Sequence, residues 1–283
     1  IQTVDAKTKK VEVTFDEEGT YSLKVSAKDK AGNISSSNEY KNIVIDKTAP
    51  IVNVEGADSN SFNNMPKVVM ITVDDENFDP ATTEVSTAGE TTDWKQSGKT
   101  WYKTVSFTKD GDYNLTVTAK DKAGNVSTPE VLSNVVIDTT APVISFTGVE
   151  KKLYGTNVVG MFTVKDRNFK PELAKISTTG KVGKWSEENG VWSVPVTFTS
   201  EEGVQSFNAV AKDLAGNQSE NVNFSGFEID KTAPKLTLSW DKTNANGYYN
   251  SRRTATLTVE DKHFDPVGLQ LNGASVSSWS HNG

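Results

Sequence analysis

The residues of this chain best suited to chemistry are aspartates in three short loops, VDDENFDP (73–80), IDKTAP (45–50) and AKDKAGN (119–125). The candidate set is Asp46, Asp74, Asp75, Asp79 and Asp121. Ca²⁺ takes six to eight oxygen ligands and carboxylates are suitable ones, so these side chains would hold Ca²⁺ if folding brought them together. Such an ion would neutralise the clustered charge. The question is which elements position the loops.

The same aspartates also have a purely structural interpretation. Asp and Asn are common turn formers, because their side chains bond their own backbone, and Gly32, Gly124 and Gly216 are expected to supply positive φ in these turns. In the second copy of the acidic loop, Lys and Arg replace three of the acidic residues. The carboxylates left there are Asp138, Asp166 and Asp213. These replacements favour calcium at the first copy over the second.

Groups for catalysis are scarce in the sequence. The two histidines, His263 and His281, suggest no triad, and there is no cysteine to act as a nucleophile, a metal ligand or a disulfide partner. Asp74 and Asp75 are adjacent on a predicted strand, so their side chains point to opposite faces and cannot act as an acid and base pair. No phosphate-binding glycine loop or metalloprotease spacing is present. The sequence therefore predicts a protein that is not an enzyme.

The elements around these loops recur at a fixed interval. The joint ID(K/T)TAP begins at Ile45, Ile137 and Ile229, and the corner AKDxAGN recurs with the same period of 92 residues. A fixed period of this size indicates tandem modules. Cutting at the joint predicts two complete modules, 46–137 and 138–229, preceded by the second half of a module at 1–45 and followed by the first half of one at 230–283. The chain is expected to be part of a longer array.

Within a module the apolar residues alternate with polar ones, as in the stretch from Tyr113 to Ala119. This period of two is typical of half-buried β-strands. Similar strands are predicted at 68–73, 101–107, 134–137 and 143–146, with short ones at 84–86 and 92–95. About seven strands in 92 residues predict an all-β chain of tandem immunoglobulin-like β-sandwich domains arranged end to end.

The joint itself is short and stiff. Only Asp138 to Pro142 separate the strand that ends at Ile137 from the one that begins at Val143, and Pro142 restricts both itself and Ala141. We therefore expect successive modules to form a semi-rigid rod. In a sandwich of this topology, the loops after the second and sixth strands lie at the end where the chain enters, so the candidate aspartates should converge near the joint.

Aromatic residues offer a second kind of site. Trp94 and Trp101 flank a predicted four-residue turn, Gln96 to Lys99, which would place their rings directly opposite each other, and Trp185 and Trp192 repeat the spacing. Sugars stack on such rings, but a hairpin clasp or core contact is the simpler interpretation. The loop phenylalanines Phe78, Phe169 and Phe264 are expected to plug the core.

Trp240 has no aromatic counterpart in the other modules. Together with Tyr248 and Tyr249, it is the candidate site for a ligand, either a glycan or a host protein. The net charge of −7 argues against nucleic acid as a partner. The longest apolar run, Val68 to Val73, is too short to insert into a membrane.

The joint, the AKDxAGN corner and the segment GYYNSRRTATLTVEDKHFDP (247–266) resemble the bacterial Ig-like repeats of large surface proteins and adhesins, mainly of the Gram-positive type. The resemblance covers nearly the whole chain. It implies an extracellular, cell-wall-anchored stalk that carries a binding or catalytic tip, with Ca²⁺ bound at inter-domain junctions as in some related adhesins.

Three functions are compatible with these observations. The first is a structural stalk that acts as a spacer at the bacterial cell surface. The second is an Ig-like module that binds a glycan or a host protein. The third is a fibre subunit, in which the half-module at 230–283 of one chain completes the half-module at 1–45 of another by pairing strands.

Overall fold

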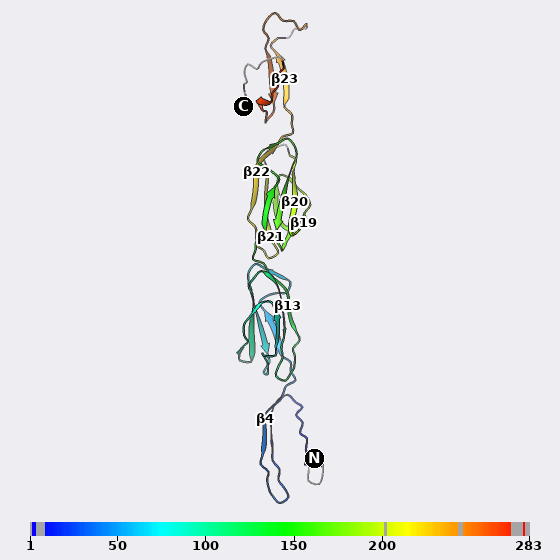
Figure 1. Cartoon of the computed structure of the whole chain (residues 1–283), viewed down its shortest axis with the longest axis vertical. Coiled ribbons are helices and arrows are strands. Elements are labelled where there is room, and N and C mark those ends of the chain that lie inside the picture. The colour runs from blue at the N-terminus through cyan, green and yellow to red at the C-terminus, as the bar shows by residue number, and fades with distance from the viewer. Residues whose placement is uncertain (1, 4–8, 201–202, 243–245, 273–279, 281–283) are drawn as a thin grey trace. The chain divides into compact units, whose positions relative to one another are not determined.

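The computed structural model describes residues 2–3, 9–200, 203–242, 246–272 and 280 (Figure 1). The all-β prediction is confirmed, and no α-helix is found among these residues. The chain divides into two compact units. The first comprises Ile1–Ala141 with Asp213–Asn217, and the second comprises Pro142–Lys212 with Gln218–Gly283.

The strands up to residue 137 form a short pair (β1 with β2), an N-terminal hairpin and a first complete module. They are β1 (Gln2–Thr3), β2 (Lys9–Lys10), β3 (Gly19–Val25), β4 (Asn38–Ile45), β5 (Ile51–Glu55), β6 (Ser61–Asn63), β7 (Lys67–Asp74), β8 (Glu84–Thr87), β9 (Glu90–Thr91), β10 (Lys95–Ser97), β11 (Thr100–Phe107), β12 (Gly111–Thr118) and β13 (Glu130–Ile137). The hairpin consists of β3 paired with β4. The first complete module consists of β5 to β13.

The first complete module is a sandwich of two sheets. One sheet has the order β10-β11-β7-β5, with β9 also on β11, and the other has the order β6-β13-β12-β8. Alternate residues of β7 face inward, so Val69, Ile71 and Val73 are fully buried while Val68 and Met70 are exposed. Leu115 and Val117 of the facing sheet complete the same core.

The strands after residue 142 are β14 (Val143–Thr147), β15 (Leu153–Tyr154), β16 (Val158–Lys165), β17 (Phe169–Thr178), β18 (Lys181–Val182), β19 (Ser186–Glu188), β20 (Val191–Phe198), β21 (Gln205–Asp213), β22 (Val222–Ile229), β23 (Lys235–Trp240) and β24 (Ala255–Glu260), with a 3₁₀ turn at Pro266–Gly268. The second complete module consists of β14 to β22. It has the sheets β14-β16-β20-β18 and β15-β22-β21-β17. A C-terminal hairpin consists of β23 paired with β24.

Two of the predicted strands differ from the structure. The strand predicted at 134–137 begins four residues earlier as β13, because a bulge at Asn134 (φ 55°) lets both Leu132 and Val135 face inward and breaks the simple alternation. The strand predicted at 92–95 is instead divided between β9 and β10, with Thr92 bonded to Thr104 between them.

The four-residue turn predicted between the paired tryptophans is also wrong. Gly98 adopts φ +63°, which permits a two-residue turn with Ser97 opposite Thr100. Trp101 therefore lies opposite Gln96 rather than opposite Trp94. The same shift occurs in the second complete module, where Trp192 lies opposite Glu187.

Candidate functional site

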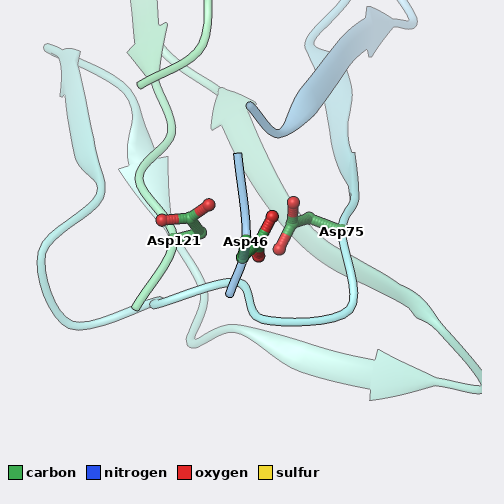
Figure 2. Close-up of side chains that lie close together, drawn as sticks. All are labelled: Asp46, Asp75 and Asp121. Atoms are coloured by element: carbon green, nitrogen blue, oxygen red, sulfur yellow. The ribbon is translucent and has the colours of Figure 1, made fainter. Parts of the chain in front are cut away.

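Three of the five candidate aspartates come together at the start of the first complete module (Figure 2). Asp46 follows β4, Asp75 follows β7, and Asp121 lies in the corner after β12. One carboxylate oxygen from each of the three lies within 4.8 Å of those of the other two. Asp121 is buried at 3% exposure, and the other two are half-buried. We call this set the joint cluster.

Strand pairing explains why the joint cluster forms. Ile51, at the start of β5, pairs with Asp74 at the end of β7, so the chain entering from Asp46 runs close to the acidic loop. An isolated bridge between Phe78 and Asp121 then ties the acidic loop to the corner. Two further backbone bonds join these loops, from Asp79 N to Lys120 O and from Lys122 N to Asn77 O.

Two side-chain amides fix the joint to the loops of the module that follows it. Asn77 donates from Nδ2 to Oδ2 of Asp46 at 2.6 Å. Asn125 donates from Nδ2 to the backbone carbonyl of Asp46 at 3.1 Å and to Oδ2 of Asp121 at 2.7 Å. Sequence reasoning did not assign these asparagines a role. The signal was their place inside the recurring loop VDDENFDP (73–80) and the recurring corner AKDxAGN.

The corner is also closed by backbone donors. Oδ1 of Asp121 accepts hydrogen bonds from the N–H groups of Gly124 at 2.7 Å and Asn125 at 2.8 Å. Gly124 adopts φ +96°, a left-handed conformation that glycine enters without steric cost. The predicted turn-forming role of this aspartate is therefore present in the geometry, and it coexists with membership of the joint cluster.

The charges of the joint cluster change the acidity of Asp75. Burial of its carboxyl raises the pKa above the ordinary value of 3.8, and the nearby Asp46 and Asp121 carboxylates raise it further. A hydrogen bond from the N–H of Asn77, at 2.7 Å, acts in the opposite direction because it stabilises the charged form. The ionised cluster therefore carries repulsion that a proton or a cation on Asp75 would relieve.

The structure places the other two predicted ligands, Asp74 and Asp79, outside the joint cluster. Asp74 is the last residue of β7, and its Oδ1 accepts a hydrogen bond of 2.5 Å from the hydroxyl of Thr100 on the neighbouring strand. Asp79 accepts hydrogen bonds from Ala81 N at 3.1 Å and the Thr82 hydroxyl at 2.9 Å. These are turn and cross-strand contacts.

The donor set of the joint cluster fits a hard cation. Its three carboxylates offer only oxygen ligands, as Ca²⁺ prefers, and they could supply part of a shell of six to eight. Both oxygens of Asp121 already accept N–H donors, and Oδ2 of Asp46 accepts one. Oδ1 of Asp121 accepts two of these donors, whereas Oδ2 of Asp121 and Oδ2 of Asp46 accept one side-chain donor each and keep a second lone pair for a cation.

The amide contact recurs at the next joint. Asn217 donates from Nδ2 to the carbonyl of Asp138 and to Oδ2 of Asp213, at 2.7 Å in each case. At the third joint a histidine takes the place of Asn77, and His263 Nδ1 lies 2.8 Å from Oδ2 of Asp230. This hydrogen bond from His263 holds the pKa of Asp230 below its ordinary value. His281 lies outside the described residues.

The paired tryptophans pack against the core of their module. Phe78 is buried at 1% exposure, and its ring lies 5.1 Å from that of Trp94 and 5.6 Å from that of Trp101. Phe169 makes the same contacts with Trp185 and Trp192. The plug role of these two phenylalanines agrees with the structure, and the tryptophans serve as the clasp around them. Phe264 is only half-buried.

The candidate ligand residues lie on and near the C-terminal hairpin. Trp240 ends β23 and is 51% exposed, and Tyr248 is 84% exposed. Tyr249 is 40% exposed, with the guanidinium of Arg253 above its ring at 4.6 Å. Arg253 also contacts Asp241 at 3.4 Å. Among the described residues no helix has the length and apolar character needed to cross a bilayer.

The family described as bacterial Ig-like domain (group 3) matches residues 9–128 and 99–180, which together are more than half of the chain. No curated protein sequence matches.

Several solved structures are similar to parts of the chain. The fibronectin(III)-like modules of CbhA from Clostridium thermocellum share 14% identity over 64% of this chain and 94% of that one, with a TM-score of 0.29. The Escherichia coli adhesin FdeC shares 15% identity over 75% and 73%, with a TM-score of 0.36. The Yersinia pseudotuberculosis adhesin InvE shares 17% identity over 62% and 58%, with a TM-score of 0.32.

Proposed function

The chain belongs to the family of bacterial Ig-like domains (group 3), and on this premise we propose that it is a structural spacer of a bacterial surface protein. Its modules stand end to end outside the cell and project a binding tip away from the cell wall. Ig-like folds are typically non-enzymatic, and the spacer performs no reaction. Its role is reach.

The attachment of the joint to the following module is the observation that carries this proposal. Asn77 binds the side chain of Asp46 and Asn125 binds its backbone, so the residue that leaves the N-terminal hairpin is part of the hydrogen-bonded top of the first complete module. A connector held in this way has few free torsions. Pro50, the last residue of the link before β5, is itself buried, which restricts the connector further.

A spin-label distance measurement tests whether the joint is stiff. The chain contains no cysteine, so Lys41→Cys on β4 and Lys95→Cys on β10 would carry the only two labels. Both side chains are exposed. We expect a single narrow distance distribution for the doubly labelled chain, and a broader one after Asn77→Ala and Asn125→Ala are added. Lys122→Ala, an exposed neighbour, should leave the width unchanged.

A broad distribution in the doubly labelled parent chain would show a swivelling joint and would remove the basis of the spacer. Small-angle scattering of the full chain supplies the second measurement. We expect an elongated particle whose length exceeds that of a single sandwich at least threefold. A compact profile would contradict the end-to-end arrangement.

Calcium at the joint cluster belongs to the same proposal. Neutralising Asp46, Asp75 and Asp121 would relieve the repulsion that raises the pKa of Asp75, and it would tie the joint to both loops at once. Ca²⁺ would therefore narrow the spin-label distribution, while Mg²⁺, which requires a tighter octahedral shell, would do so less. In Asp46→Asn neither Ca²⁺ nor Mg²⁺ should change the width of the spin-label distance distribution.

Ligand binding is a second candidate function, favoured by the exposure of Trp240 and Tyr248 on the C-terminal hairpin. Exposed aromatic faces stack on sugar rings and anchor protein interfaces. A glycan array and a set of extracellular-matrix proteins would be screened with the parent chain and with Trp240→Ala. Binding that disappears in the variant supports this function, and binding that survives it excludes these residues.

A further inference from the structure

The threonines of the second joint hydrogen-bond to an acidic residue that lies earlier in the chain. Oγ1 of Thr140 donates to Oδ2 of Asp110 at 2.9 Å. Asp110 lies in the turn between β11 and β12 of the first complete module. Its Oδ1 also accepts hydrogen bonds from the N–H and from the hydroxyl of Thr139, both at 2.9 Å. One carboxylate therefore binds two consecutive residues of the joint.

The first joint has the same kind of contact with a glutamate. Oε1 of Glu18, in the turn before β3, accepts hydrogen bonds from the N–H of Lys47 at 2.7 Å and from the hydroxyl of Thr48 at 2.8 Å. These bonds, the one from Thr48 first, hold the pKa of the Glu18 carboxyl below its ordinary value of 4.5. The acid and the threonine both stand 92 residues before their counterparts at the second joint. The contact therefore recurs with the period of the modules.

The third joint has the same residue types. Thr232 stands at the position of the threonine and Glu202 at that of the acid. Glu202 lies outside the described residues. The described part of this joint is attached to the module before it, because Nζ of Lys231 donates to the carbonyl of Thr199, which follows β20, at 3.0 Å.

The contacts made to the two sides of the first joint alternate along the chain. Asp46 is bound by Asn77 and Asn125 of the module that follows. Lys47 and Thr48 come after Asp46, yet they are bound by the turn before β3. A residue attached to the following module thus precedes two residues attached to the preceding turn. Bending or extending the joint would have to break one of these two sets of contacts.

The second joint has the same order of contacts. The carbonyl of Asp138 accepts the amide of Asn217. The next two residues, Thr139 and Thr140, are bound by Asp110. Every donor and acceptor in this arrangement belongs to the chain itself, so the arrangement does not depend on Ca²⁺.

We propose that the carboxylate of Glu18 or Asp110 and the hydroxyl of the joint threonine position each joint against the turn that precedes it. We call the pairs Glu18 with Thr48 and Asp110 with Thr140 the acid–threonine contacts. The inference rests on the proposed spacer function and adds positioning residues to it. A joint attached only to the following module could still turn about its other end, and the acid–threonine contacts remove that freedom.

The acid–threonine contacts also explain the pattern ID(K/T)TAP. The second variable residue, Lys47 or Thr139, gives its backbone N–H to the acid, and every residue except proline can supply this donor. The next residue gives its side-chain hydroxyl, so it is threonine in each copy. The position that varies is therefore the one whose side chain the contact does not require.

Two substitutions of Thr48 test its hydroxyl in the full chain. Thr48→Val removes the hydroxyl and keeps the branched shape, whereas Thr48→Ser keeps the hydroxyl. In the chain labelled at Lys41→Cys and Lys95→Cys, we expect Thr48→Val to broaden the distance distribution and Thr48→Ser to leave its width unchanged. Glu18→Ala should broaden it as Thr48→Val does, and the exposed neighbour Glu17→Ala should not. Chelator is present throughout, so that Ca²⁺ at the joint cluster does not contribute.

Thermal melting separates a positioning role from a loss of folding. Glu18 and Thr48 are exposed, and substitutions at exposed positions change the unfolding free energy little. The melting midpoints of Thr48→Val should therefore stay within about 4 °C of those of the parent chain. A broader distance distribution without a larger shift of melting is the result expected of a positioning residue.

Amide hydrogen exchange at the second joint gives a readout that needs no label and no stiff joint. In Asp110→Ala the N–H of Thr139 loses its acceptor. Its exchange should become at least about threefold faster, as expected for the loss of a weak hydrogen bond. The N–H of Asp138, which is bonded to the carbonyl of Asn63, should exchange as before. Lys109→Ala, an exposed neighbour, should change neither rate.

Three results would overturn the proposal. The first is a Thr48→Val distribution as narrow as that of the parent chain. The second is equal broadening by Thr48→Ser and Thr48→Val, because the hydroxyl would then not be the cause. The third is an unchanged exchange rate of Thr139 in Asp110→Ala. A distribution that is already broad in the parent chain would overturn the spacer function instead, and the exchange of Thr139 would then decide on the acid–threonine contact by itself.

Discussion

Removing the Asn125 amide is the sharpest perturbation of the joint. In Asn125→Ala the carbonyl of Asp46 and the buried carboxylate of Asp121 each lose a donor, at 3.1 and 2.7 Å, while the backbone bonds of the corner remain possible. A neutral hydrogen bond contributes about 0.5–1.5 kcal/mol and one to a charged group about 1.5–3 kcal/mol. The first complete module should therefore lose about 2–4 kcal/mol of unfolding free energy.

Differential scanning calorimetry of the full chain measures this loss. A kcal/mol lowers the melting midpoint of a domain of this size by about 4–8 °C, so the transition of the first complete module should fall by at least about 8 °C. Asn217→Ala is the matched variant, because Asn217 makes the same pair of contacts with Asp138 and Asp213. Asn217→Ala should lower the melting transition of the second complete module. The two variants together therefore assign each calorimetric transition to its module.

Asn114→Ala serves as the control for Asn125→Ala, because its exposed side chain bonds only the bulge at Asn134 and has no contact with the joint. If Asn125→Ala changes the midpoint no more than this control does, the amide does not couple the joint to the module. Equal shifts of both transitions in either variant would also refute the reasoning, since the contacts would then not be local.

Three further outcomes follow from the same module. Burial and two neighbouring carboxylates raise the pKa of Asp75, so its ionised form lowers stability once the pH exceeds that raised value; Asp75→Asn should raise the melting midpoint at pH 7 and leave it nearly unchanged below about pH 4. Equal effects at both pH values would exclude the charge as the cause. Ca²⁺ at a hundredfold excess over its Kd should add about 2.7 kcal/mol to the same transition, reversed by chelator and absent in Asp46→Asn; a midpoint indifferent to chelator argues against binding. Phe78→Ala should lower the free energy of unfolding by about 3–5 kcal/mol, because it leaves a cavity beside Trp94 and Trp101. A change in the fluorescence quenching of these two tryptophans would show that the effect is local. A loss below about 1 kcal/mol would show that this ring does not anchor the loop.

The fold could be predicted largely from the sequence, because the period of 92 residues and the alternation of apolar positions can both be read directly from the order of residues. The bulge at Asn134 could not be predicted from the sequence. The added residue reverses the alternation of apolar and polar positions, so the first half of β13 does not continue the pattern of the second half. The predicted length of the turn between Trp94 and Trp101 was wrong for a related reason. Whether Gly98 closes a two-residue or a four-residue turn depends on a positive φ that composition permits but does not require.

The site was predictable to the extent that topology alone positions it. Asp46, Asp75 and Asp121 meet because the entering chain and two loops share one end of the sandwich. Asp74 is adjacent to Asp75 in the sequence, so its side chain points in the other direction, where it contacts Thr100. The roles of Asn77 and Asn125 were not predicted, because amide donors to a joint depend on contacts 31 and 79 residues apart. Calcium itself stays a prediction.

The parallel pairing of β6 with β13 bears on how a module responds to tension. Ser61 to Asn63 run beside Val135 to Ile137 in the same direction, close to where the chain leaves the sandwich. Pulling the two ends apart slides these strands past each other, so their hydrogen bonds are loaded in shear and must break together instead of opening one by one. A protein under drag from flowing liquid would gain resistance to extension from this short parallel contact.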